Sequence, residues 1–143
     1  EHRWVEELNA MNAMFVWQRN GRTVLSTPPL SGTILEGVTR DSLLELARQQ
    51  GGDIGIDEVL EEPTSIEAVR AGIEAGELRE MFACGTAAVI VPVGRLIDGD
   101  VARTVGDGEP GATTMALRSA LLDIQYGRST DTRGWMRTIE PVG

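Results

Sequence analysis

Gly37, Val38 and Thr39 directly precede a stretch of helical periodicity, and their residue types suit a chemical role. The first turn of a helix leaves backbone N–H groups unpaired and carries a partial positive charge. A glycine lets a ligand approach the backbone, and a threonine hydroxyl adds a donor, so the segment suits a phosphate group. The alternative is a capped surface helix preceded by a turn, and this feature alone favours that alternative.

A second group, Cys84-Gly85-Thr86-Ala87, lies between two apolar stretches. Small residues in a turn allow several backbone N–H groups to face one anion. The alternative is a tight turn that is built from small residues because little space is available. The residue pattern does not decide between an anion-accepting turn and a purely structural one.

Other catalytic classes find little support in the sequence. One cysteine and one histidine, His2 beside the terminus, cannot form a metal-ligand cluster, so no metal site is expected. No serine occupies a Gly-x-Ser-x-Gly elbow, and no histidine lies where a catalytic triad needs one. Cys84 is expected to be a small buried side chain without a partner base. Glu6 and Glu7 precede an apolar strand and, taken alone, are two solvated acids.

The charge composition excludes several functions. The chain has 143 residues, and all 13 of its basic residues are arginine. Without lysine it cannot supply a Schiff-base lysine, a P-loop lysine or a lysine general base. The 22 acidic residues give a net charge of −9, which argues against nucleic acid or an anionic membrane surface as a partner.

Length, hydropathy and cysteine content predict the domain organisation and the cellular compartment of the chain. No apolar run reaches the roughly 18 residues of a membrane span. The length predicts one domain over residues 1–143. A single cysteine cannot form an internal disulfide, so a reducing compartment and a cytoplasmic location are expected. The chain opens on charged residues at Glu1, without methionine or a signal-peptide pattern, as we expect of a piece of a longer protein.

The elements that position these residues begin with a predicted β-hairpin. Residues 12–17 and 23–27 are rich in strand-forming side chains. Asn20-Gly21 lies between them and indicates a tight turn, because both residues tolerate positive φ. Pro28 and Pro29 are expected to end the second strand, since neither can donate to a strand ladder.

An amphipathic helix is predicted to follow over residues 41–50. Its apolar side chains recur at helical spacing. Thr39 is a plausible N-cap, and Gly51-Gly52 supplies a C-terminal stop. Ile54 and Ile56 alternate with polar neighbours and indicate a short strand.

The remaining pattern completes an α+β domain with short strands and three helices. A second helix is predicted over residues 65–75 and a third over residues 113–126, with Met115 and Gln125 among its inward residues. The further predicted strands are residues 79–83, residues 88–93 and a weaker pair over 96–103 around Gly99.

Four stretches of the chain resemble one enzyme family. Residues 6–12 (EELNAMN) and 27–40 (TPPLSGTILEGVTR) resemble the class IV pyridoxal-phosphate aminotransferases. Residues 80–88 (EMFACGTAA) and 121–128 (LLDIQYGR) are similar to the branched-chain amino acid aminotransferases within that class. The stretches occur in the family order at compatible spacing. The resemblance implies most of the large C-terminal domain of the class IV, D-amino acid aminotransferase-like fold, with short mixed strands.

The resemblance implies that pyridoxal 5'-phosphate is the cofactor and that this chain makes only non-covalent contacts with it. Glu7 would bond the pyridine nitrogen and keep it protonated, which makes the ring a better electron sink. Leu35 would pack near the ring. Backbone groups at Gly37 and Val38, with the backbone and hydroxyl of Thr39, would hold the phosphate.

The second turn receives two implied roles. Gly85 and Thr86 would contribute to cofactor binding, with the Thr86 hydroxyl on the phosphate. The backbone N–H groups of Thr86 and Ala87 would bind the substrate carboxylate. These roles agree with the two anion-accepting segments that the residue types suggest.

Several positions depart from the family pattern. Asn9-Ala10 and Met14 stand where small residues and an aromatic are usual. Glu36 replaces a common proline and places a negative charge near the phosphate loop. The Cys-x-x-Cys pair of some members is absent, since those positions are Ala88 and Val91.

The largest departure is a missing region. The family's Schiff-base lysine and phosphate-binding arginine lie upstream of the position of Glu7, and part of the substrate pocket comes from a partner subunit. The resemblance therefore implies a C-terminal, cofactor-binding half that lacks any catalytic residue of its own. The full-length enzyme would be a homodimer that moves an amino group from Leu, Ile or Val to 2-oxoglutarate by a ping-pong mechanism, whereas the isolated chain would be inactive.

Two alternatives stay open at this point. The chain is either part of such an enzyme or a non-catalytic half-domain or pseudoenzyme that acts as a binding module. Within the class, D-amino acid aminotransferase and aminodeoxychorismate lyase are the other candidates.

Overall fold

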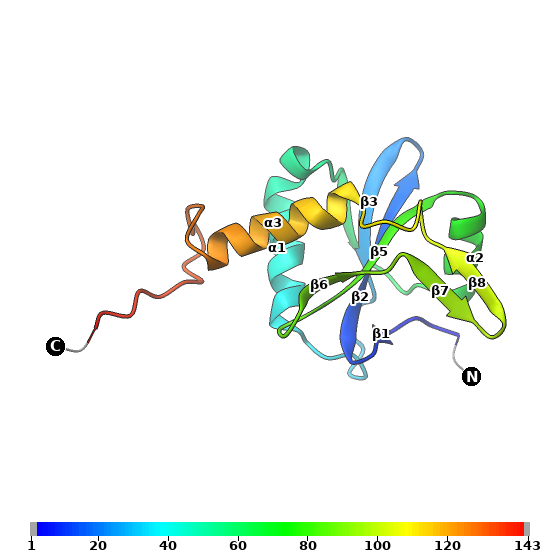
Figure 1. Cartoon of the computed structure of the whole chain (residues 1–143), viewed down its shortest axis with the longest axis horizontal. Helices are drawn as coiled ribbons and strands as arrows, with labels where there is room; N and C mark the ends of the chain where they lie inside the picture. The colour runs from blue at the N-terminus through cyan, green and yellow to red at the C-terminus, as the bar shows by residue number, and fades with distance from the viewer. Residues whose placement is uncertain (1–2, 142–143) are drawn as a thin grey trace.

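The computed structural model describes residues 3–141, so His2 lies outside the described part. A six-stranded mixed sheet forms its centre, with the strand order β4-β3-β2-β5-β6 and β1 paired to β2 (Figure 1). Only β3 and β4 run parallel among these pairs. The strands of this sheet are β1 (Glu7–Leu8), β2 (Met11–Arg19), β3 (Arg22–Thr27), β4 (Glu58–Glu61), β5 (Leu78–Gly85) and β6 (Val89–Pro92).

Helices α1 (Val38–Ile54) and α3 (Ala112–Gln125) cover one face of the sheet. Helix α2 (Ile66–Glu74) and the antiparallel pair β7 (Arg95–Asp98) and β8 (Val101–Thr104) lie on the other face (Figure 1). The prediction of an α+β fold with short strands and three helices is confirmed for the described residues. No helix within residues 3–141 is long and apolar enough to cross a membrane.

The central strand β2 is buried on both faces, which explains its unbroken apolar sequence. Successive side chains of a strand point to opposite faces. Met14 and Val16 pack into the core under α1 and α3. Ala13, Phe15 and Trp17 pack into a second core beneath α2. The sheet therefore separates two hydrophobic cores, and β2 contributes to both.

Two hairpins flank β2 and end in turns of the same kind. Asn20 and Gly21 have φ of 50° and 75° between Arg19 and Arg22, so the predicted turn is confirmed. Asn9 and Ala10 have φ of 52° and 63° between β1 and β2, where the sequence did not predict a turn. Positive φ at both central residues matches the twist of paired strands. Ala10 adopts this conformation without the usual glycine.

Helix α1 differs from its prediction at both ends. Gly37 is the N-cap, and Thr39 lies inside the first turn, so the prediction of Thr39 as N-cap is wrong. The helix also continues through Gly51-Gly52 to Ile54 and ends at Gly55 in the left-handed conformation. Gly51 remains helical because the Ile56 backbone closes on it, with the Ile56 N–H donating to the Gly51 carbonyl at 2.7 Å.

The prediction of a strand around Ile54 and Ile56 is also wrong, because these residues form the end of α1 and the loop that follows it. The strand that lies next in the chain is β4, inside the acidic stretch. It pairs with β3 in parallel, from Val24 opposite Glu58 to Thr27 opposite Glu61. Its formation depends on this pairing rather than on an apolar pattern.

The other predicted elements agree with the structure. Helix α2 begins where the sequence predicts it, with Ser65 as the N-cap residue, whose hydroxyl accepts from the Ala68 N–H at 3.0 Å. The strands near residues 79–83, 88–93 and 96–103 are present as β5 to β8. Helix α3 is confirmed, but Met115 and Gln125 are exposed rather than inward.

The chain beyond α3 reaches Pro141 without a helix or strand and extends away from the body (Figure 1). Arg133 connects the first part of this C-terminal segment to α1. The guanidinium lies 3.3 Å from the Glu45 carboxylate, donates to Gln49 and stacks 4.9 Å from the centre of the Trp135 ring.

Candidate functional site

Glu7 and the loop before α1 line an open hollow of about 620 Å³. The Leu35 N–H donates to Oε1 of Glu7 at 2.7 Å. This bond occupies one carboxylate oxygen and leaves Oε2 for another donor. The hollow is lined by Glu7, Ala10, Gly32, Thr33, Ile34, Leu35 and Glu36. A carboxylate held in this way is suited to accept from a cationic group in the hollow.

Asn12 connects the segments around this hollow. It lies opposite Glu7 in the β1–β2 pairing and opposite Cys84 in the β2–β5 pairing. Its side chain is 4% exposed and donates from Nδ2 to the Leu35 carbonyl at 2.8 Å. A Cβ atom at Gly37 would lie only 2.3 Å from Oδ1 of Asn12. Asn12 therefore bonds the α1 loop through its side-chain amide and lies beside Glu7 and Cys84 through strand pairing.

The N-terminus of α1 follows directly after this loop. Gly37, its N-cap residue, makes no side-chain cap hydrogen bond, and among the described residues the N–H groups of the first turn have no side-chain acceptor. Val38 is 77% exposed, Thr39 is half-buried, and both follow Glu36, which lines the hollow. These positions combine backbone donors, a hydroxyl and a positive helix end, which is a donor set suited to phosphate.

A buried arginine anchors the same end of α1. Arg40 is 1% exposed, and its Nη2 donates to the Glu61 carboxylate at 2.6 Å and to the Pro28 carbonyl at 3.1 Å. Its Nη1 lies 3.3 Å from Asp41. The Arg40 guanidinium lowers the pKa of the Glu61 carboxyl against the opposing effect of burial, and Arg48 adds to the lowering. Arg40 thus fixes both ends of the loop between Pro28 and α1.

The second predicted segment forms the β5–β6 hairpin. Cys84 and Gly85 belong to β5, and the exposed residues Thr86, Ala87 and Ala88 form the turn. A Cβ atom at Gly85 would lie 3.2 Å from Met11, next to the turn that contains Ala10. Among the described residues, no hydrogen bond links Thr86 or Ala87 to the α1 loop. The structure brings Glu7, Leu35 and Gly37 into one contact group, and the roles of Thr86 and Ala87 stay predictions.

Leu35 and Glu36 occupy the outer part of the site. The Leu35 side chain is 64% exposed, and Glu36 is also exposed. The backbone of Leu35, rather than its side chain, makes the contacts with Glu7 and Asn12. Its packing against a ring stays a prediction that requires the ligand.

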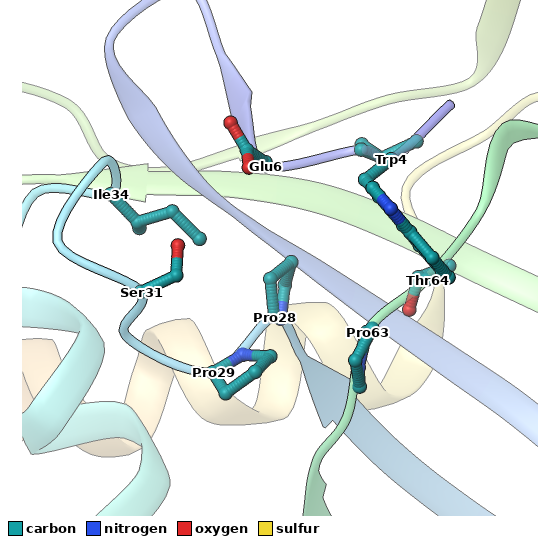
Figure 2. A pocket seen from close by; sticks show the side chains of 9 residues that line it. Trp4, Glu6, Pro28, Pro29, Ser31, Ile34, Pro63 and Thr64 are labelled. Atoms are coloured by element: carbon teal, nitrogen blue, oxygen red, sulfur yellow. The ribbon is translucent and has the colours of Figure 1, made fainter. Parts of the chain in front are cut away.

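A separate hollow of about 330 Å³ lies between Trp4 and the proline-rich start of the loop (Figure 2). Its walls are mainly apolar side chains, including those of Pro28, Pro29 and Pro63, and Glu6 is the one charged residue among them. Ile34 lines both hollows. Among the described residues, neither hollow is lined by a cation, and Glu7 and Glu36 line the other one. The hollow beside Glu7 is the candidate site because the Leu35 N–H holds one oxygen of the Glu7 carboxylate and because its lining loop leads directly into the N-terminus of α1.

Cys84 is fully buried, and burial raises the pKa of its thiol to about 12. The thiolate is the reactive form of cysteine. We therefore expect the folded chain to leave a thiol reagent such as Ellman's reagent unconsumed at pH 8, and the chain unfolded in guanidinium to consume one equivalent. Stoichiometric labelling of the folded chain at the rate of a free thiol would contradict the burial of Cys84.

No cluster of three or more histidine, cysteine, aspartate or glutamate side chains within residues 3–141 is arranged to hold a metal ion. The structural roles of Asn12 and Arg40 were not anticipated. The signal for Asn12 is an amide at the start of an otherwise apolar strand, which predicts a specific buried partner. Arg40 offers no local signal, because its partners come from distant segments.

Comparisons with known proteins place this geometry in a family. The family model for amino-transferase class IV matches residues 1–96. A branched-chain-amino-acid aminotransferase from Mycolicibacterium smegmatis is 47% identical over 136 residues, which are 95% of this chain and 36% of that protein. A probable branched-chain-amino-acid aminotransferase from Streptomyces coelicolor is 48% identical over 139 residues, which are 97% of this chain and 36% of that protein.

Solved structures agree with these relatives. The branched-chain amino acid aminotransferase from Escherichia coli matches 92% of this chain and 38% of its own, with a TM-score of 0.72 and 34% identity. The enzyme from Thermobaculum terrenum in its PLP-form matches 92% of this chain and 37% of its own, with a TM-score of 0.70 and 33% identity. The chain thus spans little more than a third of the length of these proteins. It belongs to the class IV aminotransferase family and is similar to its branched-chain amino acid aminotransferases.

Proposed function

We propose that this chain is the C-terminal, cofactor-binding part of a pyridoxal-phosphate-dependent branched-chain amino acid aminotransferase. The observation that carries the proposal is the bond of the Glu7 carboxylate to the loop that lines this hollow and leads directly into the uncapped start of α1. A carboxylate and an anion-binding helix end are the groups that a pyridine ring with a phosphate arm requires.

The residues present fit the cofactor. Oε2 of Glu7 is left to accept from the ring nitrogen, while Oε1 holds the Leu35 N–H. The backbone of Val38 and Thr39 and the hydroxyl of Thr39 supply donors for the phosphate. Gly37, whose N–H donates to the Leu35 carbonyl at 2.9 Å, lets the phosphate approach the backbone. When bound, pyridoxal phosphate supplies an electron sink for the carbanion formed at the substrate Cα. Glu7 sustains that chemistry by keeping the ring nitrogen protonated.

The β5–β6 turn completes the proposed site. The Thr86 hydroxyl adds a donor for the phosphate, and Gly85 lets the backbone approach closely. The N–H groups of Thr86 and Ala87 bind the substrate carboxylate and orient the amino acid. Leu35 packs near the ring. These roles are supported by the exposure of the turn and by its attachment to β2 at the Asn12–Cys84 pair.

The complete enzyme would contain the Schiff-base lysine in its N-terminal half, since residues 1–143 include none. It would act in the cytoplasm as a homodimer on Leu, Ile or Val with 2-oxoglutarate, by a ping-pong mechanism. A lysine is needed to carry the aldehyde and to move the proton at the substrate Cα. The isolated chain is therefore expected to bind ligand without catalysing amino transfer.

Pyridoxamine 5'-phosphate is the appropriate probe for the chain alone, because it carries the ring and the phosphate but needs no lysine. We expect saturable binding, measured by equilibrium dialysis and by the ³¹P resonance of the ligand, that inorganic phosphate reverses. Glu7→Gln should weaken binding about tenfold, because it removes a charged acceptor from the ring nitrogen.

Glu6→Gln is the matched control for this experiment. Glu6 is the adjacent acid, its carboxylate accepts from the exposed Thr33 hydroxyl at 3.3 Å, and it lines the other hollow. We expect its variant to bind as the parent chain does. An absence of saturable binding by the parent chain, or an equal loss in both variants, would contradict the proposed function.

A further inference from the structure

We propose that Asn12 is a positioning residue, which restrains the backbone at Leu35 so that Glu7 keeps one carboxylate oxygen free for the ring nitrogen of the ligand. The inference rests on the proposed function for the identity of the ligand. The restraint on the backbone is independent of it. Asn12 itself touches neither phosphate nor ring in this assignment and acts through Leu35 and Glu7.

The first argument is that the two peptide groups joined at Leu35 are each held by a different side chain. Asn12 donates from Nδ2 to the Leu35 carbonyl at 2.8 Å, and the Leu35 N–H donates to Oε1 of Glu7 at 2.7 Å. The carbonyl belongs to the Leu35–Glu36 peptide group and the N–H to the Ile34–Leu35 peptide group, and each group is planar. Holding both groups restrains the φ and ψ of Leu35 between them, and with these the position of the N–H that occupies one oxygen of Glu7.

The second argument is the shape of the loop around the amide. Gly37 has φ −72° and ψ 128°, a conformation that any L-residue can adopt. Conformational freedom therefore does not require glycine at this position. A Cβ atom there would lie 2.3 Å from Oδ1 of Asn12, a separation at which the amide would have to shift. Glycine is required because the Asn12 amide approaches the backbone at the helix N-terminus.

The third argument is the position of Asn12 in the sheet. Its strand neighbours are Glu7 on β1 and Cys84 on β5. The residue is 4% exposed, so its amide is specified by protein contacts rather than by water. Asn12 therefore lies where the α1 loop meets both strands that carry proposed ligand contacts.

Leu35 amide exchange tests the assignment without ligand. In the parent chain, we expect NMR-detected hydrogen exchange at the Leu35 N–H to be slowed at least tenfold against an unstructured peptide. Asn12→Ala should remove most of this protection while the amides paired between β2 and β3 keep theirs. Exchange at the unprotected rate in the parent chain would overturn the proposal, and this measurement needs no variant to fold.

Ligand binding provides a measurement that a purely structural role of Asn12 would leave unchanged. With pyridoxamine 5'-phosphate labelled with ¹⁵N in the ring, we expect Asn12→Ala to weaken binding about tenfold and to shift the bound ring nitrogen towards its unprotonated resonance at neutral pH. The parent chain should hold it protonated. An unchanged affinity and ring resonance in Asn12→Ala would overturn the proposal.

Thr27→Val is the matched control. Thr27 is also buried, and its hydroxyl donates to the Ala13 carbonyl at 2.7 Å, so the variant loses one buried side-chain bond to a backbone carbonyl. It does not touch Leu35 or Glu7. We expect a comparable loss of stability without a change in Leu35 exchange or in the ring resonance. Equal effects of the two variants on those readouts would overturn the proposal.

A double-mutant cycle tests the close approach at Gly37. Gly37→Ala in the parent chain should accelerate Leu35 exchange, because the added methyl displaces the Asn12 amide. In the Asn12→Ala background, the same change should have little further effect. Equal effects in both backgrounds would refute the contact. Failure of the parent chain to bind the probe would count against the proposed function alone, since the exchange and cycle measurements remain decisive for Asn12.

Discussion

Arg40→Met should lower the free energy of unfolding by about 2–3 kcal/mol, because it removes two charge-assisted hydrogen bonds from a buried position. The bonds go to Glu61 and to the Pro28 carbonyl, and the methionine fills most of the vacated volume. The expected loss is at the lower end for a buried ion pair because Glu61 keeps Arg48 as a partner. Urea denaturation provides the measurement.

Arg48→Met is the matched control for this prediction. Arg48 binds the other oxygen of Glu61 at 3.0 Å, but its side chain is half exposed. Exposed ion pairs contribute little, so a change below about 1 kcal/mol is expected. Equal losses at the two arginines would show that burial of Arg40 does not set the strength of the contact.

The pH dependence of stability offers a second measurement on the same pair. Arg40 lowers the pKa of Glu61 in the folded state. A carboxyl group with a lowered folded pKa stabilises the protein above its unfolded pKa of about 4.3, and this contribution is lost as the pH falls through the folded value. In Arg40→Met, the free energy of unfolding that is lost on acidification should therefore be smaller by this contribution.

Glu80→Ala should lower the free energy of unfolding by about 2 kcal/mol, because Glu80 caps α3 from a neighbouring strand. Its carboxylate accepts from the N–H of Thr113 at 3.0 Å and from the N–H and hydroxyl of Thr114 at 2.7 and 2.6 Å. Gly111, the N-cap residue, has no side chain to perform this role. The negative charge also interacts favourably with the positive helix end.

Thermal and urea unfolding would measure the effect of Glu80→Ala. Glu80→Gln should lose less, since it retains one acceptor oxygen without the charge. Glu77→Ala, at an exposed acidic residue nearby in the chain, should change stability by less than about 0.5 kcal/mol. A loss in Glu77→Ala as large as that in Glu80→Ala would argue against the cap.

The predictable parts of the fold are those with local signals. Asn20-Gly21 identifies its own turn, and Ser65 identifies the start of α2. The ends of α1 were predicted incorrectly because tertiary contacts override the local preference there. Gly51 stays helical because the Ile56 backbone packs directly against it, and β4 forms because it pairs in parallel with β3.

The candidate site was predictable to the extent that its residues belong to short contiguous motifs. Gly37, Val38 and Thr39 could be placed at a helix start from the sequence, although Thr39 lies inside the helix rather than at its cap. The bond between Glu7 and Leu35 could not be foreseen, because it depends on how the β1–β2 hairpin meets the loop. The caps and anchors supplied by Glu80 and Arg40 were also beyond local pattern, since their partners are distant in the chain.

The meeting of β1, β5 and the α1 loop at Asn12 also has a kinetic consequence. These segments are separated by long stretches of sequence, and contacts between distant residues form only after the chain has closed the loops between them. A hairpin that folds early does not contain the complete junction. The ability to bind ligand should therefore arise late in refolding, together with the docking of the loop onto a finished sheet.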